Sequence, residues 1–384
     1  MDVEHARGWN LILLTIIVSL GCVSTAAAGI RPATIFPSDR SSVIGPYVTF
    51  SWEYGGHTSN TTYILSIQPL ATGRPAVTLN VDRPETRRMS YTFAPGDAGD
   101  VRWRVQAVGP VPGGGLAEGH WSAEAVFSLY PTVADRIRRT GKLLVATPPA
   151  SYDPFVGLNT NGRFLDFEVR LLHWLLPRIG AQLGLPRAPR LEVTNVPWGK
   201  IWAYMQAGRA DIAFRSMTRS EIREREYPNL RFTVGYTNNH QVFIQPGSGG
   251  QFPMALSGRI VGVESGTVNE EAARYLAPRY GFTVKSLDGD YGNIYAALRR
   301  GDIPFALVDS SLVHEHLGRT LFPLGGESDL DPALRAFYRQ QLGLDHEEYS
   351  FLVYEGTSGT LREILDKILQ SPEYRDFLKE AAGP

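Results

Sequence analysis

The sequence predicts an all-β sandwich at the N-terminal side and a larger α/β region that forms two lobes. Residues 30–130 contain short β-rich runs that partly alternate in polarity and are separated by Gly, Pro and Asp, which is typical of a sandwich. From residue 141 onward, strand-like apolar runs alternate with helical patterns, which indicates βαβ units and mainly parallel sheets. The strand–turn–helix order recurs on both sides of the Gly- and Ser-rich segment 246–250, so we expect two similar lobes that face each other across a cleft.

Length and composition agree with a folded, multidomain protein. The chain has 384 residues, which is enough for two or three domains. Hydrophobic residues make up 43% and charged residues 20%, as in ordinary globular proteins. The formal net charge is −1, which argues against nucleic acid or an anionic membrane surface as the main partner.

The N-terminal segment has the features of a secretory signal. Its apolar run, residues 11–23, has 13 residues, whereas spanning a bilayer takes about 20. Ala26, Ala27 and Ala28 before Gly29 provide a cleavage site of small residues. We therefore expect residues 1–28 to be a signal peptide and the mature protein to lie in the periplasm or at the extracytoplasmic face.

The single cysteine leaves two alternatives for membrane attachment. Cys22 follows Gly21 and can be the lipidated first residue of a bacterial lipoprotein, which would anchor the protein to the membrane. Cleavage after Ala28 would instead remove Cys22 and release a soluble protein. Neither alternative leaves the two cysteines that a disulfide needs.

The β-rich segment contains six candidate strands. In one of them Val101, Trp103 and Val105 share a face, while Arg102 and Arg104 lie on the other. The candidate strands are 47–52, 62–67, 76–81, 89–93, 101–108 and 123–129.

Three aromatic motifs make this segment similar to a fibronectin type III domain. They are Phe50-Ser51-Trp52, Trp103-Arg104-Val105-Gln106-Ala107 and His120-Trp121-Ser122. The resemblance implies an immunoglobulin-like sandwich over 30–130 without catalytic chemistry. Trp52 and Trp103 are accordingly expected in its core.

The α/β elements follow a short basic connector at 131–140. The apolar run 142–147 predicts a buried strand, and Val169, Leu172, Leu176 and Ile179 recur at helical spacing, which predicts a helix over 167–183. The later predicted strands are 191–194, 210–214, 258–263, 282–285 and 305–309, and the later helices are 201–207, 269–276, 291–300, 360–370 and 372–381.

These elements divide residues 141–384 into two lobes. We expect lobe one to comprise about 141–241 and 349–384, and lobe two about 242–348. The stretch 321–348 is long and is interpreted as an insertion, which leaves the return crossover to lobe one open.

The segment 216–223 combines groups that can bind an anion. It follows a predicted buried strand, Ser220 can cap a helix, and Glu221 lies in the favoured first turn. Hydroxyls, backbone N–H groups at a helix start and the Arg223 guanidinium are the parts of a carboxylate pocket. The alternative is an ordinary capped helix with a solvated arginine.

Seven segments in order resemble the bacterial periplasmic solute-binding proteins for polar amino acids, of the family 3 type. They are residues 141–147, 152–155, 161–168, 207–211, 216–223, 262–267 and 292–309. The resemblance implies a two-lobed, type II periplasmic-binding-protein fold without a cofactor or catalytic residues. Two departures are Asp166 in place of a usual Gly and Val268 in place of a common Thr.

The resemblance also implies a set of ligand-binding residues. Ser216, Thr218 and Arg223 would hold the ligand carboxylate from lobe one, and either Thr267 or the N–H groups of Val268 and Asn269 would close the site from lobe two. Asp309 would bind the ammonium group, although it can instead cap the helix that follows. Tyr152 and Phe155 would cover the apolar part of the ligand. Arg215, where relatives carry a small polar residue, would bind an acidic side chain or be a solvated edge residue.

The expected function is extracytoplasmic capture of an amino acid or similar small carboxylate, for an ABC-type uptake system or for sensing. One alternative is an envelope interaction or sensor protein with a repurposed pocket, whose sandwich docks to a partner. Another is a dehydratase-like enzyme on the same scaffold, with Glu264 or Asp153 as general acid. A metal site is not expected, because the histidines are scattered and the closest pair, His314 and His316, does not share a helix face.

Overall fold

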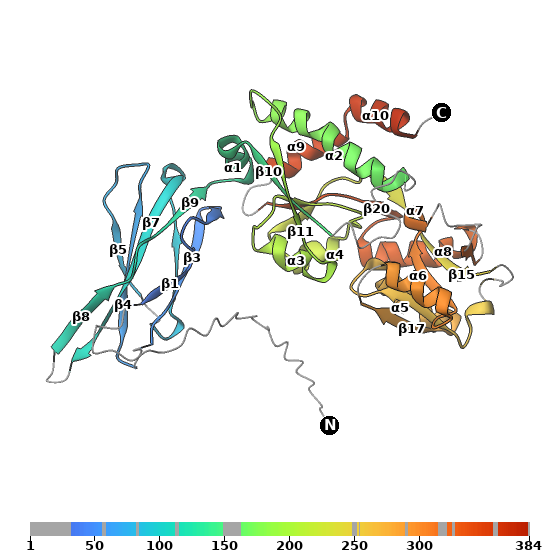
Figure 1. Ribbon diagram of the computed structural model, residues 1–384, viewed down its shortest axis with the longest axis horizontal. Coiled ribbons are helices and arrows are strands. Elements are labelled where there is room, and N and C mark those ends of the chain that lie inside the picture. Colours follow the sequence, from blue (N-terminus) through green and yellow to red (C-terminus); the bar gives the residue numbers. More distant parts are fainter. Residues whose placement is uncertain are drawn as a thin grey trace.

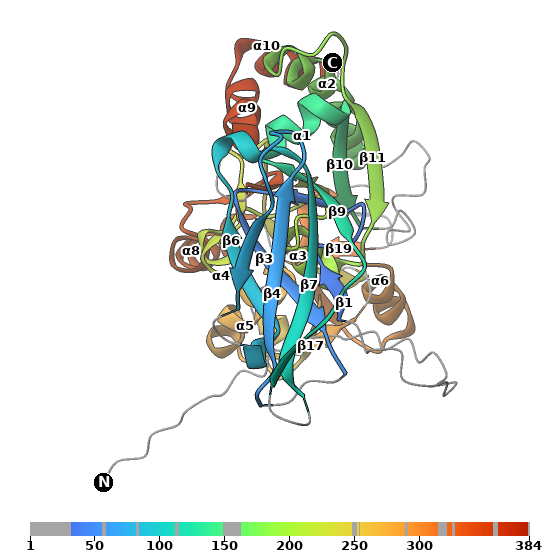
Figure 2. The same cartoon turned by 90° about the vertical axis from the view of Figure 1, so that its left-hand side faces the viewer.

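The computed structural model describes residues 32–55, 59–81, 84–111, 115–148, 163–247, 252, 254–288, 291–313, 321–324, 327–355 and 360–382. The β-rich part and the two α/β lobes follow one another along the long axis of the molecule (Figure 1). In a view turned by 90° about the vertical axis, the β-rich part lies in front of the lobes (Figure 2). Among the described helices, none is both long and apolar enough to cross a membrane.

The N-terminal part consists of two sheets. One sheet joins β1 (Ala33–Phe36), β3 (Tyr47–Glu53) and β6 (Arg88–Thr92). The other has the order β2 (Ser42–Ile44), β9 (Ala125–Tyr130), β7 (Gly99–Val111), β4 (Thr62–Pro69) and β5 (Val77–Asn80), and β8 (Gly115–Trp121) also pairs with β7. All six predicted strands are present, and β1, β2 and β8 are additional.

An aromatic cluster fills the space between these sheets. Phe50, Trp52 and Trp103 are at most 2% exposed, and the rings of Phe50 and Trp103 meet edge-on with centroids 5.0 Å apart. The Trp103 indole N–H donates to the carbonyl of Pro37 at 2.9 Å, so its polar atom is satisfied inside the core. Both tryptophans are therefore core residues, as expected.

Helix α1 (Val133–Thr140) occupies the expected connector and packs into lobe one. Thr132 caps its start by accepting from the N–H of Asp135, and Gly141 ends it at φ 64°. Val133 and Ile137 lie in the core of lobe one, with at most 1% exposed. The segment expected to be a polar connector is thus a structural part of the lobe that follows it.

Lobe one is a five-stranded sheet with helices on both sides (Figure 1). The strand order is β11 (Arg190–Asn195), β10 (Lys142–Thr147), β12 (Ile212–Ala213), β21 (Leu352–Tyr354) and β13 (Leu230–Phe232). Strand β10 is parallel to both neighbours, whereas β21 runs antiparallel to both of its own. The helices are α2 (Arg163–Gln182), α3 (Trp198–Gln206), α4 (Glu221–Glu226), α9 (Thr360–Leu369) and α10 (Pro372–Ala382).

Lobe two repeats this plan. Its strand order is β17 (Thr283–Leu287), β16 (Ile260–Glu264), β18 (Phe305–Asp309), β15 (Gln241–Pro246) and β19 (Leu321–Pro323). Its helices are α5 (Val268–Tyr280), α6 (Tyr291–Arg300), α7 (Ser310–Val313) and α8 (Glu327–Phe337), and a π-helical turn (Tyr338–Leu342) continues α8.

The stretch 321–348, interpreted from sequence as an insertion, contributes regular elements to lobe two and includes one strand of the crossover. Strand β19 is an edge strand of the lobe-two sheet, and Leu334 and Phe337 of α8 pack into the lobe-two core. The lobes are connected by an antiparallel pair, β14 (Thr237–Asn239) and β20 (Glu347–Tyr349). Asn239 lies opposite Glu347 in this crossover.

Candidate functional site

The turn between β12 and α4 has a strained backbone. Arg215 and Ser216 have φ values of 88° and 50°, a region that non-glycine residues seldom occupy. The N–H of Ser216 donates to Glu168 Oε1 at 2.8 Å, and the Tyr236 hydroxyl donates to the same oxygen. Glu168 of α2 therefore fixes the turn in this conformation. Such strain is often found at ligand sites, where surrounding contacts maintain it.

Two buried polar atoms of this turn are unused within the described part of the chain. The Nε of Arg215 and the Oγ of Ser216 are buried, and neither makes a hydrogen bond there. Leaving such atoms unsatisfied costs about 1–3 kcal/mol each. The turn can therefore donate to an additional acceptor from both residues.

Burial raises the pKa of Glu168 from its ordinary value of 4.5 to about 7, against the opposing effects of Tyr236, Ser216 and Arg215. The folded state then binds a proton that the unfolded state releases, so folding stability falls as pH rises from about 4.5 to 7. Between pH 5 and pH 8 this effect lowers the free energy of unfolding by up to about 3 kcal/mol, and we expect the Glu168→Gln variant to lack that pH dependence. Chemical denaturation at both pH values measures it, and an unchanged difference between the two pH values would contradict the assignment.

Arg223 connects the two lobes. Ser220 caps α4 by accepting from the N–H of Arg223, and the Arg223 side chain is only 8% exposed. Its Nη2 pairs with Glu271 Oε1 of α5 at 2.8 Å and lies 3.4 Å from the carbonyl oxygen of Gly266. The guanidinium also lies over the ring of Trp202, 5.0 Å from its centroid. The guanidinium is thus held at the interface between the lobes.

The facing turn of lobe two is built around the start of α5. Thr267 is the N-cap, accepting from the N–H of Glu270, and its hydroxyl donates to the carbonyl of Glu264 at 2.8 Å. Val268 packs into the lobe-two core, and Asn269 is 3% exposed. The Thr267 hydroxyl is therefore used in capping α5, and a ligand would form hydrogen bonds with this turn mainly through backbone N–H groups.

Two buried carboxyl groups meet beside the crossover. One amide group, Asn239 Nδ2, donates to Asp309 Oδ1 at 2.9 Å and to Glu347 Oε2 at 2.8 Å. Glu347 also accepts from Gln241 Nε2 at 2.6 Å and from Thr218 Oγ1 at 2.7 Å. This network joins lobe one, lobe two and the crossover.

Electrostatics place Arg223 and Asp309 around the same carboxyl group. Burial raises the pKa of Glu347 well above its ordinary value, and the nearby charge of Asp309 raises it further. The positive charge of Arg223 lowers the pKa of the same group. A buried cation of lobe one and a buried anion of lobe two therefore both lie near Glu347.

The structure brings Thr218, Arg223 and Asp309 together at this interface. Tyr152, Phe155 and Cys22 lie outside the described residues, as do Asp153, His314 and His316. No cluster of His, Cys, Asp and Glu that could hold a metal occurs within the described ranges. Sequence reasoning missed Glu168, Asn239 and Glu347, because each is an isolated polar residue without a recognisable spacing.

Comparison with known proteins agrees with this architecture. Residues 143–373 match the bacterial extracellular solute-binding proteins, family 3. The arginine-binding extracellular protein ArtP of Bacillus subtilis is 28% identical over 142 residues, which cover 37% of this chain and 51% of that protein. The match thus spans about half the length of that relative. A putative ABC transporter arginine-binding protein 2 of Escherichia coli is 27% identical over 50% of this chain and 71% of its own length.

Among solved structures, an amino acid ABC transporter substrate-binding protein from Streptococcus pneumoniae, bound to L-arginine, has a TM-score of 0.47 at 20% identity. That similarity covers 65% of this chain and 97% of the other. The family match over residues 143–373 covers more than half of the sequence. The chain therefore belongs to the bacterial extracellular solute-binding proteins of family 3.

Proposed function

We propose that the protein captures one amino acid, or a similar small carboxylate, between its two lobes at the extracytoplasmic face. The observation that carries this proposal is the pair of buried opposite charges where the lobes meet. Arg223 of lobe one pairs with Glu271 of α5 at 2.8 Å. Asp309 of lobe two accepts from Asn239 of the crossover at 2.9 Å. A zwitterionic ligand needs one anion site and one cation site. The role is binding rather than catalysis, as in the family to which the chain belongs.

Arg223 supplies the anion site. Within the described residues the hydrogen bonds of its guanidinium all leave from Nη2, so Nε and Nη1 are available to a carboxylate. Ser216 Oγ and Arg215 Nε add two buried donors close in sequence, and the N–H groups of Val268 and Asn269 close the site from lobe two. Guanidinium groups bind carboxylates through two parallel hydrogen bonds, which orients the ligand.

Asp309 supplies the cation site. Its Oδ1 accepts a hydrogen bond from Asn239 at 2.9 Å, which fixes the orientation of the carboxylate. The residue is 6% exposed, so the charge of this carboxylate would attract a ligand ammonium with little screening by water. Tyr152 and Phe155 would cover the apolar part of the ligand, and Thr218 acts through its hydrogen bond to Glu347.

Two features bear on which side chain the ligand carries. The relatives named above are described as arginine-binding, which supports a basic amino acid. Arg215, beside Ser216, instead favours a neutral or acidic side chain because like charges repel. A screen with arginine, glutamine and glutamate distinguishes these cases.

We expect a ligand with both charged groups to raise the melting temperature, because binding to the folded state alone stabilises it by mass action. At a concentration 100 times the Kd the gain is about 2.7 kcal/mol, which is a shift of roughly 5–10 °C for a domain of this size. N-acetylation or amidation of the ligand should abolish the shift. If the des-amino analogue raised the melting temperature equally, Asp309 would not be part of the binding site.

The β-rich segment 30–130 is proposed to be a fibronectin type III-like domain that docks to an envelope partner or spaces the lobes from the membrane. Residues 1–28 would be a signal peptide, with Cys22 as a lipid anchor if it is retained. The captured ligand would pass to an ABC permease or be read by a sensor. Residues 141–384, together with α1, would form the solute-binding domain.

We expect a protein that begins at Thr132 to fold and to bind ligand within about threefold of the full chain, because contacts between domains are usually modest. One that begins at Lys142 should fold poorly, because it lacks the α1 residues Val133 and Ile137 of the lobe-one core. Calorimetry on both proteins measures this. Loss of binding in the folded longer protein would mean that the β-rich part contributes to the pocket.

A further inference from the structure

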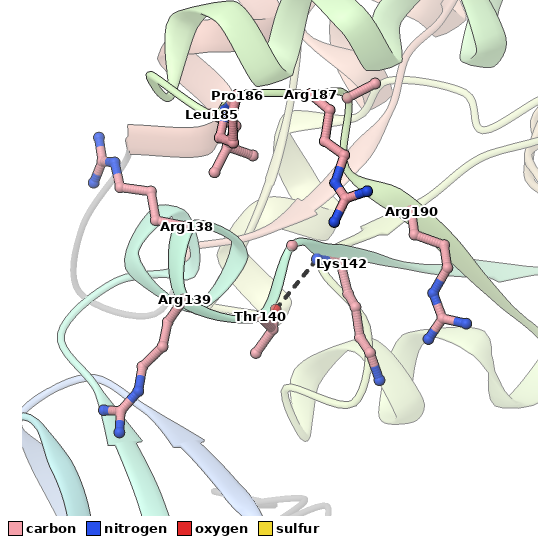
Figure 3. A pocket seen from close by; sticks show the side chains of 10 residues that line it. Arg138, Arg139, Thr140, Lys142, Leu185, Pro186, Arg187 and Arg190 are labelled. Atoms are coloured by element: carbon pink, nitrogen blue, oxygen red, sulfur yellow. Dashed lines mark hydrogen bonds between the residues drawn. The ribbon is translucent and has the colours of Figure 1, made fainter.

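A concave site lies where the strands β10 and β11 of lobe one begin. It is a cavity of about 550 Å³ between the end of α1, the start of β10 and the loop from α2 to β11. Figure 3 shows the Arg187 guanidinium near its centre and Lys142 and Arg190 on one side of it, whereas the Arg138 and Arg139 side chains point away from Arg187 on the α1 side.

This basic cavity is remote from the candidate site at the interface between the lobes. Lys142 and Arg190 pair at the first residues of β10 and β11, whereas the strained turn 215–216 follows the carboxyl end of β12. Strand β10, which runs from the basic cavity toward the end of the sheet where the 215–216 turn lies, has six residues and is roughly 16 Å long. The inference therefore does not depend on the function proposed for that site.

Positive charge in this region exceeds negative charge. Lys142 Nζ and Arg190 Nη2 share a single carboxylate oxygen, Glu192 Oε1, at 2.8 and 2.7 Å. Arg138 pairs with Asp135 at 2.9 Å.

Arg139 and Arg187 also line the cavity, and neither makes an ion pair within the described residues. Five basic side chains thus face two carboxylates, Asp135 and Glu192. The chain as a whole has a formal net charge of −1, so this concentration of cations is local.

The cavity is built from fixed backbone rather than from side chains alone. The N–H of Arg190 donates to the Gly141 carbonyl at 2.8 Å, which ties the α2–β11 loop to the end of α1. The carbonyls of Arg136 and Ile137 near the end of α1 already accept from Thr140 Oγ1 and from the N–H of Gly141. Leu185, Pro186 and Ala188 provide an apolar lining. A cavity of this size is large enough for a small molecule.

We propose that this cavity binds a small organic anion that carries at least two phosphate or carboxylate groups. Cationic side chains line it from three neighbouring segments, Lys142 of β10, Arg187 of the α2–β11 loop and Arg190 of β11, so more than one anionic group can be bound at once. Guanidinium groups favour planar, bidentate contacts with phosphate or carboxylate oxygens. A concave shape suits a compact anion better than a flat surface does.

The test uses pyrophosphate as the probe and isothermal titration calorimetry on the full chain at low salt. We expect saturable binding, weakened at least tenfold by the double substitution Arg187→Gln and Arg190→Gln. The matched control is Arg299→Gln with Arg300→Gln on α6. Arg300 pairs with Asp302 at 2.7 Å, two residues ahead, as Arg190 pairs with Glu192, and Arg299, like Arg187, makes no ion pair among described residues. Both variants remove the same charge, so the control should change affinity less than twofold.

Cardiolipin vesicles, compared with phosphatidylcholine vesicles, identify the source of the anion. Binding to cardiolipin that pyrophosphate displaces would assign a lipid headgroup, and pyrophosphate binding without vesicle binding would assign a soluble anion. Three results would overturn the proposal: no pyrophosphate binding, equal affinity for pyrophosphate and inorganic phosphate, or equal loss in the two double variants.

Discussion

Replacing Arg223 with alanine is expected to weaken ligand binding about 30-fold to several thousand-fold. A micromolar ligand corresponds to about 8 kcal/mol of binding free energy. Removing one partner of a desolvated, hydrogen-bonded charge pair costs roughly 2–5 kcal/mol, partly because the ligand carboxylate then remains buried without a counter-charge. The Arg223 side chain is 8% exposed, so bulk water screens such a contact poorly.

The structure provides a matched control on the same helix. Arg225 lies two residues further along α4, its side chain is 74% exposed, and it contacts Glu221 at 3.6 Å. We expect Arg225→Ala to change affinity less than about threefold, because exposed ion pairs contribute little. Arg219 alternates along the chain with Thr218 and Ser220, which suggests that its side chain points away from the ligand. It pairs with Glu348 at 2.6 Å, however, so it is a poorer control than Arg225. Calorimetry that finds equal losses for Arg223→Ala and Arg225→Ala would remove Arg223 from the ligand site.

The contact between Arg223 and Glu271 complicates the interpretation of this variant, and a third substitution resolves it. Glu271 is 46% exposed, so its pairing with Arg223 contributes little to folding. Glu271→Gln should therefore leave the melting temperature and the ligand affinity nearly unchanged. A large loss of affinity in Glu271→Gln would mean that closure of the lobes, rather than contact with the ligand, is what Arg223 supplies.

The sequence predicted the bounds of helices and strands closely where these depend on interactions between residues near each other in the chain. The predicted strand 142–147, helix 291–300 and strand 305–309 coincide with β10, α6 and β18. Ser220 caps α4 as predicted, because the capping bond involves only neighbouring residues. These features depend on hydrophobic period and capping, both of which can be read from a short window.

Contacts between distant segments could not be predicted in this way. Glu347 meets Thr218 and Asn239 across sequence separations of 129 and 108 residues, and no local pattern marks such a network. Glu347 was also not considered as a site residue because it lies in the stretch 321–348, which was interpreted as an insertion. Thr218 and Arg223 were predicted from the anion-binding pattern of 216–223 and from the family resemblance, and Asp309 was predicted from the resemblance. Glu347, which lies among them, carries no comparable signal.

The packing of the connector helix α1 into lobe one could not be predicted for a related reason. Its sequence is rich in arginine, and a polar composition predicts a solvated segment. Arg136, however, is 4% exposed and pairs with Asp211, which precedes β12. A buried arginine cannot be told from a solvated one without knowing its partner, and this partner lies 75 residues away.

Replacing Arg136 with alanine is expected to destabilise the solute-binding domain by about 3–5 kcal/mol, because breaking a buried pair leaves one charge uncompensated. The corresponding fall in melting temperature is about 6–20 °C for a domain of this size. Asp211 is 1% exposed, and it also accepts from the N–H of Leu144 at 2.7 Å, so it cannot turn towards water without disrupting β10. Differential scanning calorimetry measures the change.

The dependence on pH and a double variant identify the cause of that loss. Burial raises the pKa of Asp211 from its ordinary value of 3.8 to about 6 even beside Arg136, so stability falls as pH rises through that window. Without Arg136 the pKa should rise further, which makes the loss larger at pH 8 than at pH 5. Arg136→Met with Asp211→Asn removes both charges, keeps the acceptor for Leu144 and should restore most of the stability. Arg138→Ala, which removes a half-exposed partner of Asp135 on the same helix, should cost less than about 1 kcal/mol, and a comparable loss there would mean that helix α1, rather than the buried pair, is the sensitive element.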